Sequence, residues 1–347
     1  MGMEGQLTIE TESGRGTMPE YNADQIKMAL TAAKDLTAAR DARRQDLTPS
    51  QADLAERSEI RANRRAAENL LASSFLKAGF EVEKFEELLA QNRSALRRIT
   101  ERRKAEAVER SSSAKETLRH GIEGRRKAIE HLADVTPPES PTEAAPKFYE
   151  VLDRPFLIWP TPGVYMHAEQ REPWNSWAKF TLDSSSRQGH EEVSFYFLWQ
   201  NPSDAYEVIH VDAYLVLNGF GLVQSEGGFF DGIRSSTLEV FARLGLLEWW
   251  NQPPTSPYQQ VAQSQLALYL SVNTGGWFDD DATESGGVSR GFDLHYNFFV
   301  VPPGGVVVFD VDVELNSYTG ADSGSIHADF AGDFEVLCPA VWIENFT

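Results

Sequence analysis

The sequence has a single cysteine, no long apolar run and no recognisable leader, and each shortage excludes a class of protein. Cys338 is the only cysteine among 347 residues, which excludes an intramolecular disulfide framework and any zinc or iron–sulfur site built from several cysteines. Apolar runs extend over only a few residues, so we expect no transmembrane segment. The N-terminus lacks a basic stretch followed by an apolar one, so we expect no ordinary signal peptide. These features predict a cytoplasmic protein or one exported by a signal-independent route.

Basic residues are also scarce, with 32 Lys and Arg against 52 Asp and Glu and a net charge of −20. The imbalance falls mainly on one part of the chain, because residues 25–135 hold 23 basic and 18 acidic side chains whereas residues 136–347 hold 8 and 29. All eight tryptophans follow residue 150. The sequence therefore joins a basic, aromatic-poor half to an acidic, aromatic-rich half.

This division predicts an α+β multidomain protein with four segments. Residues 1–20 show no periodicity and are predicted to form a flexible arm. Residues 21–135 have helical periodicity and are predicted to be partly coiled coil. Residues 136–147 are rich in proline, as in an extended linker. Residues 148–347 are predicted to form an acidic β-sandwich domain.

Helix signals recur throughout the basic half. Gly79 is expected to end one helix in the left-handed conformation, and a longer helix is predicted from Val82 to Asp134. Apolar residues of this longer helix recur every three or four positions, with a polar interruption at Arg103 and Glu106. A seam this narrow needs a partner, which predicts oligomerisation or docking on another protein, with a monomeric three-helix bundle as the alternative. The seam residues are Phe85, Leu89, Leu96, Ile99, Leu118 and Ile122.

Apolar and polar residues alternate with period two in the acidic half, which is the pattern of β-strands. Eight or nine strands are predicted, and no helical segments long enough for crossovers lie between them, so the sheets should be antiparallel. We expect a β-sandwich of jelly-roll-like form. Turns are predicted at Asn218-Gly219 and at the glycine pairs 227–228, 275–276, 286–287 and 304–305.

Aromatic and acidic residues near strand ends offer two candidate ligand sites. Tryptophans in sandwich loops can stack on sugar rings or anchor a protein interface, and the candidates are Trp249, Trp250 and Trp277. Carboxylates clustered in a loop can bind calcium, which prefers several oxygen ligands, and the candidates are Asp279, Asp280, Asp281 and Glu284. The sequence indicates no other cofactor.

Three further carboxylates, Asp310, Asp312 and Glu314, alternate along one predicted strand. They could contribute to a cation site, but a strand face that uses charge to stay in solvent is the more usual explanation. We therefore expect these side chains to be exposed. The seven histidines show no ligand spacing, and His210 and His295 are expected to be surface or half-buried residues.

Paired and tripled basic residues in the first half raise the question of nucleic-acid binding. Acidic residues are interleaved with them, aromatic residues that would stack on bases are missing, and the acidic half would repel a polyanion, so no nucleic-acid partner is predicted. Ion pairing explains the clusters better. The two halves should attract each other, but surface ion pairs contribute only about 0–1 kcal/mol each, so we expect the halves to stay apart at physiological salt.

No phosphate loop, dinucleotide fingerprint or hydrolase motif occurs in a supporting context, so no enzyme activity is predicted. A helical attachment region joined to a β-sandwich is typical of structural and adhesion proteins. We therefore predict a non-enzymatic structural or adhesion-type protein that forms homo-oligomers or docks on another protein through its helices. The alternative is a carbohydrate-binding sandwich that uses loop tryptophans, with or without calcium. A membrane-active protein is a third reading, against which the lack of a long apolar segment counts.

Overall fold

The computed structural model describes most of the chain from residue 82 onward and a few residues before it. The described residues are 73–74, 77–79, 82–134, 148–185, 188–225, 234–249, 258–274, 282–320 and 324–345. The predicted arm (1–20), the predicted linker (136–147) and most of the predicted helical region before residue 82 lie outside them.

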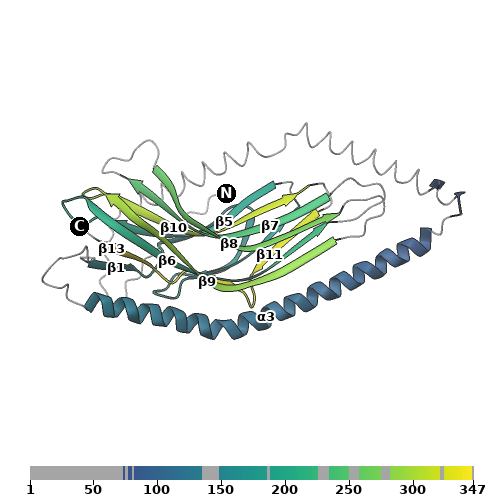
Figure 1. Ribbon diagram of the computed structural model, residues 1–347, viewed down its shortest axis with the longest axis horizontal. Helices are drawn as coiled ribbons and strands as arrows, with labels where there is room; N and C mark the ends of the chain where they lie inside the picture. Colours follow the sequence, from purple (N-terminus) through teal and green to yellow (C-terminus); the bar gives the residue numbers. More distant parts are fainter. Residues whose placement is uncertain are drawn as a thin grey trace, which may run out of the picture.

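One long helix precedes the sheets in the described residues (Figure 1). This helix, α3 (Val82–Asp134), has the bounds that its periodicity predicts. Shortly before it, Gly79 has a φ of +83°, a left-handed conformation that glycine adopts without steric cost, which confirms the expected conformation of this residue. No helix in the described part of the chain is long and apolar enough to cross a membrane.

The described strands form two sheets in which every pairing is antiparallel, so the predicted β-sandwich is confirmed. In the larger, eight-stranded sheet the main order is β1-β13-β6-β11-β4-β12, with β3 added to β4 and β9 added to β6. Its strands are β1 (Phe148–Leu152), β3 (Val164–Gln170), β4 (Trp177–Ser184), β6 (Glu207–Ser225), β9 (Ala282–Val301), β11 (Gly324–Phe330), β12 (Glu335–Leu337) and β13 (Val341–Asn345).

The smaller, five-stranded sheet has the order β2-β5-β10-β7-β8. Its strands are β2 (Leu157–Pro160), β5 (Gln188–Gln200), β7 (Arg234–Trp249), β8 (Tyr258–Thr274) and β10 (Val306–Thr319). Long neighbours such as β5 and β10 pair over most of their length, so this sheet presents one continuous outer face.

Alternate side chains of the two sheets meet in one large hydrophobic core. Phe195, Phe197 and Trp199 of β5 point into this core, which is the period-two pattern that the sequence predicts. Cys338 lies in the same core, and burial raises the pKa of its thiol well above the usual value.

Two predicted turns are wrong. β6 continues through Asn218-Gly219 and β9 continues through the glycine pair 286–287, which pairs with Phe220 and Gly221 of β6. Glycine is required there for packing, because a side chain at Gly219 would collide with the ring of Phe330. The predicted turn at 304–305 is confirmed, since Gly304 follows β9 with a φ of +66°. The pairs 227–228 and 275–276 lie outside the described residues.

α3 lies along the eight-stranded sheet, where it packs against β9, β6 and β1 (Figure 1). The helix is therefore in contact with the sandwich, contrary to the expectation that the two halves stay apart. The reason is that apolar side chains of α3 join clusters on the sheet, so the contact does not depend on ion pairs alone. The partner of α3 is a sheet rather than a second helix of the described region, so a coiled coil is not supported there.

Candidate docking site on the long helix

α3 has two parts with different surroundings. Side chains between residues 103 and 125 contact the eight-stranded sheet, whereas the N-terminal part of the helix extends past the ends of the strands (Figure 1). We call residues 82–100 the N-terminal turns. At about 1.5 Å per residue, the whole helix is about 80 Å long. One rigid element therefore links the sandwich to a surface outside it.

Small residues bring the middle of α3 close to the sheet. Ala107 and Ser111 have exposed fractions of only 4% and 0%. Ala107 packs with Phe220 of β6 and with Phe334. It also faces Gly287 of β9, where a Cβ atom would lie 2.8 Å from the Cβ of Ala107. The predicted seam, which contains only large apolar residues, does not include this contact, although the small side chains at positions 107 and 111 are a readable signal.

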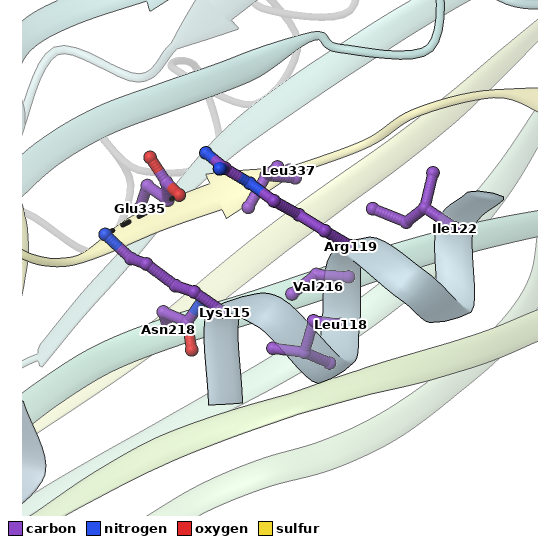
Figure 2. Close-up of a pocket in the computed structure, with 8 residues that line it drawn as sticks. All are labelled: Lys115, Leu118, Arg119, Ile122, Val216, Asn218, Glu335 and Leu337. Carbon is purple, nitrogen blue, oxygen red and sulfur yellow. Dashed lines mark ion pairs between the residues drawn. The ribbon is translucent and has the colours of Figure 1, made fainter. Parts of the chain in front are cut away.

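The C-terminal seam residues contact the same sheet. Leu118 and Ile122 pack on a cluster formed by Tyr214, Val216 and Leu337. Figure 2 shows a hollow beside these side chains, between the helix and the sheet, with room for about one water molecule. Small-molecule sites are far larger, so this hollow is a packing gap. Leu118 and Ile122 therefore have a partner within the chain, which accounts for their apolar character without a second copy.

Ion pairs between α3 and the sandwich help to orient the helix on the sheet. The pairs between α3 and the sandwich in the described residues are Lys104–Asp329 (2.6 Å), Lys115–Glu335 (3.8 Å) and Arg125–Asp293 (2.5 Å). The Arg125 guanidinium also lies over the ring of Tyr214, 4.2 Å from its centroid. Burial raises the pKa of Tyr214 despite the nearby Arg125 charge. Partly exposed pairs stabilise by about 0–1 kcal/mol each, so they orient the helix more than they hold it.

The projecting turns expose apolar side chains. Leu88 is 53% exposed and Ile99 is 37% exposed, while Leu96 is half-buried. With 3.6 residues per turn, Leu88 and Ile99 lie about 20° apart around the helix, on one side of it. We call Leu88, Leu96 and Ile99 the projecting face; the seam prediction included the last two and missed Leu88. Phe85 and Leu89 lie in the same turns, but their side chains are outside the described set.

Most residues of the predicted sugar and calcium sites lie outside the described residues. These are Trp250, Trp277, Asp279, Asp280 and Asp281. Trp249 is the last residue of β7, in register with Val306 of β10, and its side chain is not described. Glu284 lies in β9, where its carboxylate accepts a hydrogen bond from the Ser271 backbone N–H at 2.8 Å. In the described part of the chain, no group of three or more His, Cys, Asp and Glu side chains is arranged to hold a metal ion.

Two of the three β10 carboxylates are buried and Glu314 is half-buried, so the expectation that this row faces solvent is wrong. Asp310 and Asp312 are 2% and 0% exposed. Arg243 of β7 explains part of this, because its guanidinium donates a hydrogen bond to Glu314 and its Nε is 3.8 Å from Asp312. Burial acts to raise the pKa of Glu314, but the charge and the hydrogen bond of Arg243 lower it below 4.5. The register of β7 and β10, which places Arg243 opposite Asp312, is not readable from the sequence.

A histidine–carboxylate group forms where β6, β9 and β13 adjoin. His210 Nε2 is 2.9 Å from Asp212 Oδ2, and the His210 ring lies parallel to that of His295, with centroids 6.2 Å apart. Glu344 is in register with His210. Burial raises the pKa values of Asp212 and Glu344 in spite of the neighbouring histidine. His210 and Asp212 share one side of β6 at a spacing of two residues, but His295 and Glu344 join them only through the pairing of β9 and β13 with β6, which the sequence does not indicate.

Comparisons with known proteins do not assign a family. No protein-family model matches the chain. No curated protein matches it. Among solved structures, one described as "CBM4 structure and function" has a TM-score of 0.12 at 10% identity and covers 51% of this chain and 94% of its own. The infectious bursal disease virus Gt strain structure has a TM-score of 0.13 at 8% identity, with 62% of this chain and 47% of that chain covered. Such low TM-scores carry no functional argument.

Proposed function

We propose that this is a non-enzymatic structural or adhesion-type protein that associates through the projecting face of α3. The observation that carries the proposal is the position of Leu88 and Ile99, which are exposed on a helix whose other end is packed against the sandwich. Clustered apolar groups in contact with water are a common mark of protein interfaces. Because residues 103–125 are already in contact with the sheet, the projecting face can meet a partner without reorganising the sandwich.

The partner that we propose is a second copy of this chain, since a helix that projects from each chain can pair with the same helix of another. Pairing of two projecting faces would bury apolar surface that is exposed to solvent in a single chain. Each Å² of apolar surface removed from water stabilises the complex by about 25 cal/mol. The acidic sandwiches, with their large negative charge, would be held apart by the projecting turns. Docking on a different protein through the same face is the other outcome.

The test is the mass of the full chain by size-exclusion chromatography with light scattering over a range of concentrations. We expect a species heavier than the 38.8 kDa monomer that the double variant Leu88→Asp/Ile99→Asp converts to the monomer. The matched control is Ala90→Asp/Ser94→Asp, which adds the same charge at exposed positions on the opposite side of the helix and should leave the mass unchanged. A wild-type chain that is monomeric at every concentration contradicts self-association.

The carbohydrate-binding alternative predicts a different pattern in the same set of samples. A monomeric chain that binds a glycan array, and loses that binding on Trp249→Ala or Trp277→Ala, would favour the sugar-binding module. Loss of calcium with a chelator would then change glycan binding only if the carboxylates near residue 280 hold an ion.

A further inference from the structure

β8 and β9 are edge strands that meet on one side of the sandwich. Among the described strands, β8 pairs only with β7 of the smaller sheet, and β9 pairs only with β6 of the larger one. Leu268 and Leu270 of β8 pack over Gly221 of β6 and Gly286 of β9. A Cβ atom at Gly221 would lie 2.8 Å from Leu270 Cδ1, so glycine permits this close approach of the two sheets.

Side chains of β9 bond to the backbone of β8. Arg290 donates a hydrogen bond to the carbonyl oxygen of Leu266 at 2.7 Å, and the carboxylate of Glu284 accepts one from the backbone N–H of Ser271 at 2.8 Å. The Arg290 guanidinium also lies over the ring of Phe292, 4.4 Å from its centroid, which helps to orient it. Two backbone groups on the outer edge of β8 are therefore occupied by charged side chains.

The reverse contacts protect β9. Gln265 of β8 donates a hydrogen bond to the carbonyl oxygen of Asp293 at 2.6 Å, and the side chain of Gln263 accepts one from the backbone N–H of His295 at 2.8 Å. We call these four side chain–backbone hydrogen bonds between β8 and β9 the edge contacts. A strand added to either edge would have to bond to the same backbone groups, so the edge contacts compete with strand addition.

The sequence of β8 gives this protection a purpose. Its 17 residues, Tyr258–Thr274, include no charged residue and no proline, and residues 266–272 read LALYLSV. Uncharged segments with high strand propensity pair edge to edge when their backbone is accessible. Leu266 and Tyr269 are 47% and 54% exposed, so the apolar side chains that would support such pairing are at the surface. Charges that would block it are absent from β8 itself and come from β9.

We propose that the edge contacts prevent β8 from pairing with β8 of a second copy of this chain. Removal of the β9 side chains would free the carbonyl oxygen of Leu266 and the N–H of Ser271 on one edge of β8. Two such edges can then join antiparallel, so that the smaller sheets of two copies become one continuous sheet. This surface lies on the sandwich, apart from the projecting face of α3, and does not depend on association through that face.

The first test is the mass of the variant Glu284→Ala/Arg290→Ala, whose net charge equals that of its parent. The parent is the full chain with Leu88→Asp/Ile99→Asp, so the projecting face does not contribute. Light scattering should show the mass rising at least twofold from 38.8 kDa at concentrations where the parent is monomeric. The matched control Glu123→Ala/Lys127→Ala removes an exposed ion pair from α3 and should leave the mass unchanged.

A folded double variant that is monomeric at every concentration overturns the proposal. If circular dichroism shows that the double variant does not fold, Arg290→Ala alone is measured in its place, since it keeps the Glu284 bond to β8. A rise in mass of the Glu123→Ala/Lys127→Ala control equal to that of the edge variant also overturns the proposal.

Spin labels distinguish strand pairing from non-specific aggregation. Leu266→Cys places a label at the middle of β8, where two antiparallel copies bring their labels together, and Tyr165→Cys places one on β3 of the other sheet. Cys338 is 0% exposed and should not react. In the edge variant we expect coupling between labels at position 266 and none at position 165. Coupling at both positions or at neither overturns the proposal, as does coupling at 266 with the edge contacts intact. A parent that is heavier than the monomer without coupling at 266 contradicts the proposed function instead.

Discussion

On the outer face of the eight-stranded sheet, α3 approaches through small side chains, with Ala107 against Gly287, and only a few ion pairs lie around the contact. On the outer face of the five-stranded sheet, a row of carboxylates is buried around Arg243 instead. Packing on the first face depends on shape, because any larger side chain at Ala107 or Gly287 would collide with the opposing helix or sheet. The second depends on charge balance, because carboxylates held out of water need cations. Substitutions should therefore have different consequences on the two faces.

The largest effect is expected at Arg243. The change Arg243→Leu removes the cation that lies beside both Asp312 and Glu314, among side chains that are largely buried. Removing one partner of a buried ion pair costs about 3–5 kcal/mol, and urea denaturation should show a loss of that size in the free energy of unfolding. Arg98→Leu, at an exposed position of α3, should change it by less than about 0.5 kcal/mol. A loss below about 1 kcal/mol at Arg243 would mean that the pair behaves like a surface ion pair.

An intermediate effect is expected where α3 meets the other sheet. Ala107→Leu adds volume at a position that faces Gly287, so the helix must shift or the sheet must bend. Overpacking of this kind costs about 1–3 kcal/mol, measured by the same urea titration. Ala105→Leu is the matched control, since Ala105 is exposed on the same helix and should tolerate the change. Equal stability of the two variants would show that α3 is not closely packed at this point.

The smallest effect is a dependence on pH that differs between the two sheets. Arg243 holds the pKa of Glu314 below 4.5 in spite of burial, so the stabilisation from ionised Glu314 is present above pH 4.5 and is lost as the pH falls through the lowered pKa. The free energy of unfolding of the wild-type chain should therefore fall more steeply between pH 5 and pH 3 than that of Glu314→Gln. The gap between the two slopes should be of order 1 kcal/mol over this range.

Glu150 of β1 should give a pH dependence of stability of the opposite sign to that of Glu314. Burial raises its pKa above 4.5 although its carboxylate accepts a hydrogen bond from the Trp199 indole at 2.7 Å. Its contribution is therefore largest below pH 4.5 and is lost as the pH rises through the raised pKa. Glu150→Gln should remove that loss, so the variant gains stability relative to the wild-type chain between pH 4 and pH 7. If the free energies of unfolding of Glu314→Gln and Glu150→Gln, each relative to the wild-type chain, change with pH in the same direction, this account is contradicted.

Local signals in the sequence predict much of the fold correctly. The bounds of α3, the alternation in β5 and the turn at Gly304 all follow from residues close together in the chain. The sequence does not predict features that depend on contacts with residues far along the chain. The Asn218-Gly219 pair predicts a turn, yet β6 continues through it, and glycine occupies position 219 because the ring of Phe330 leaves no room for a side chain.

The candidate docking site shows the same limit. Leu96 and Ile99 were predicted members of an apolar seam, and the structure places them on the projecting turns. Leu118 and Ile122 belong to the same seam, yet they face the sandwich of their own chain. Spacing along a helix indicates which side chains share a side, but it does not indicate what that side meets.

Periodicity and the distribution of charge are sufficient to predict a long helix followed by an acidic, antiparallel β-sandwich, because both are properties of neighbouring residues. They do not predict that α3 packs against that sandwich, that Arg243 lies opposite Asp312, or that Asp310 and Asp312 are buried. The physical reason is that strand register and the contact between helix and sheet join residues far apart in the chain, and their energies depend on three-dimensional packing that no local pattern records.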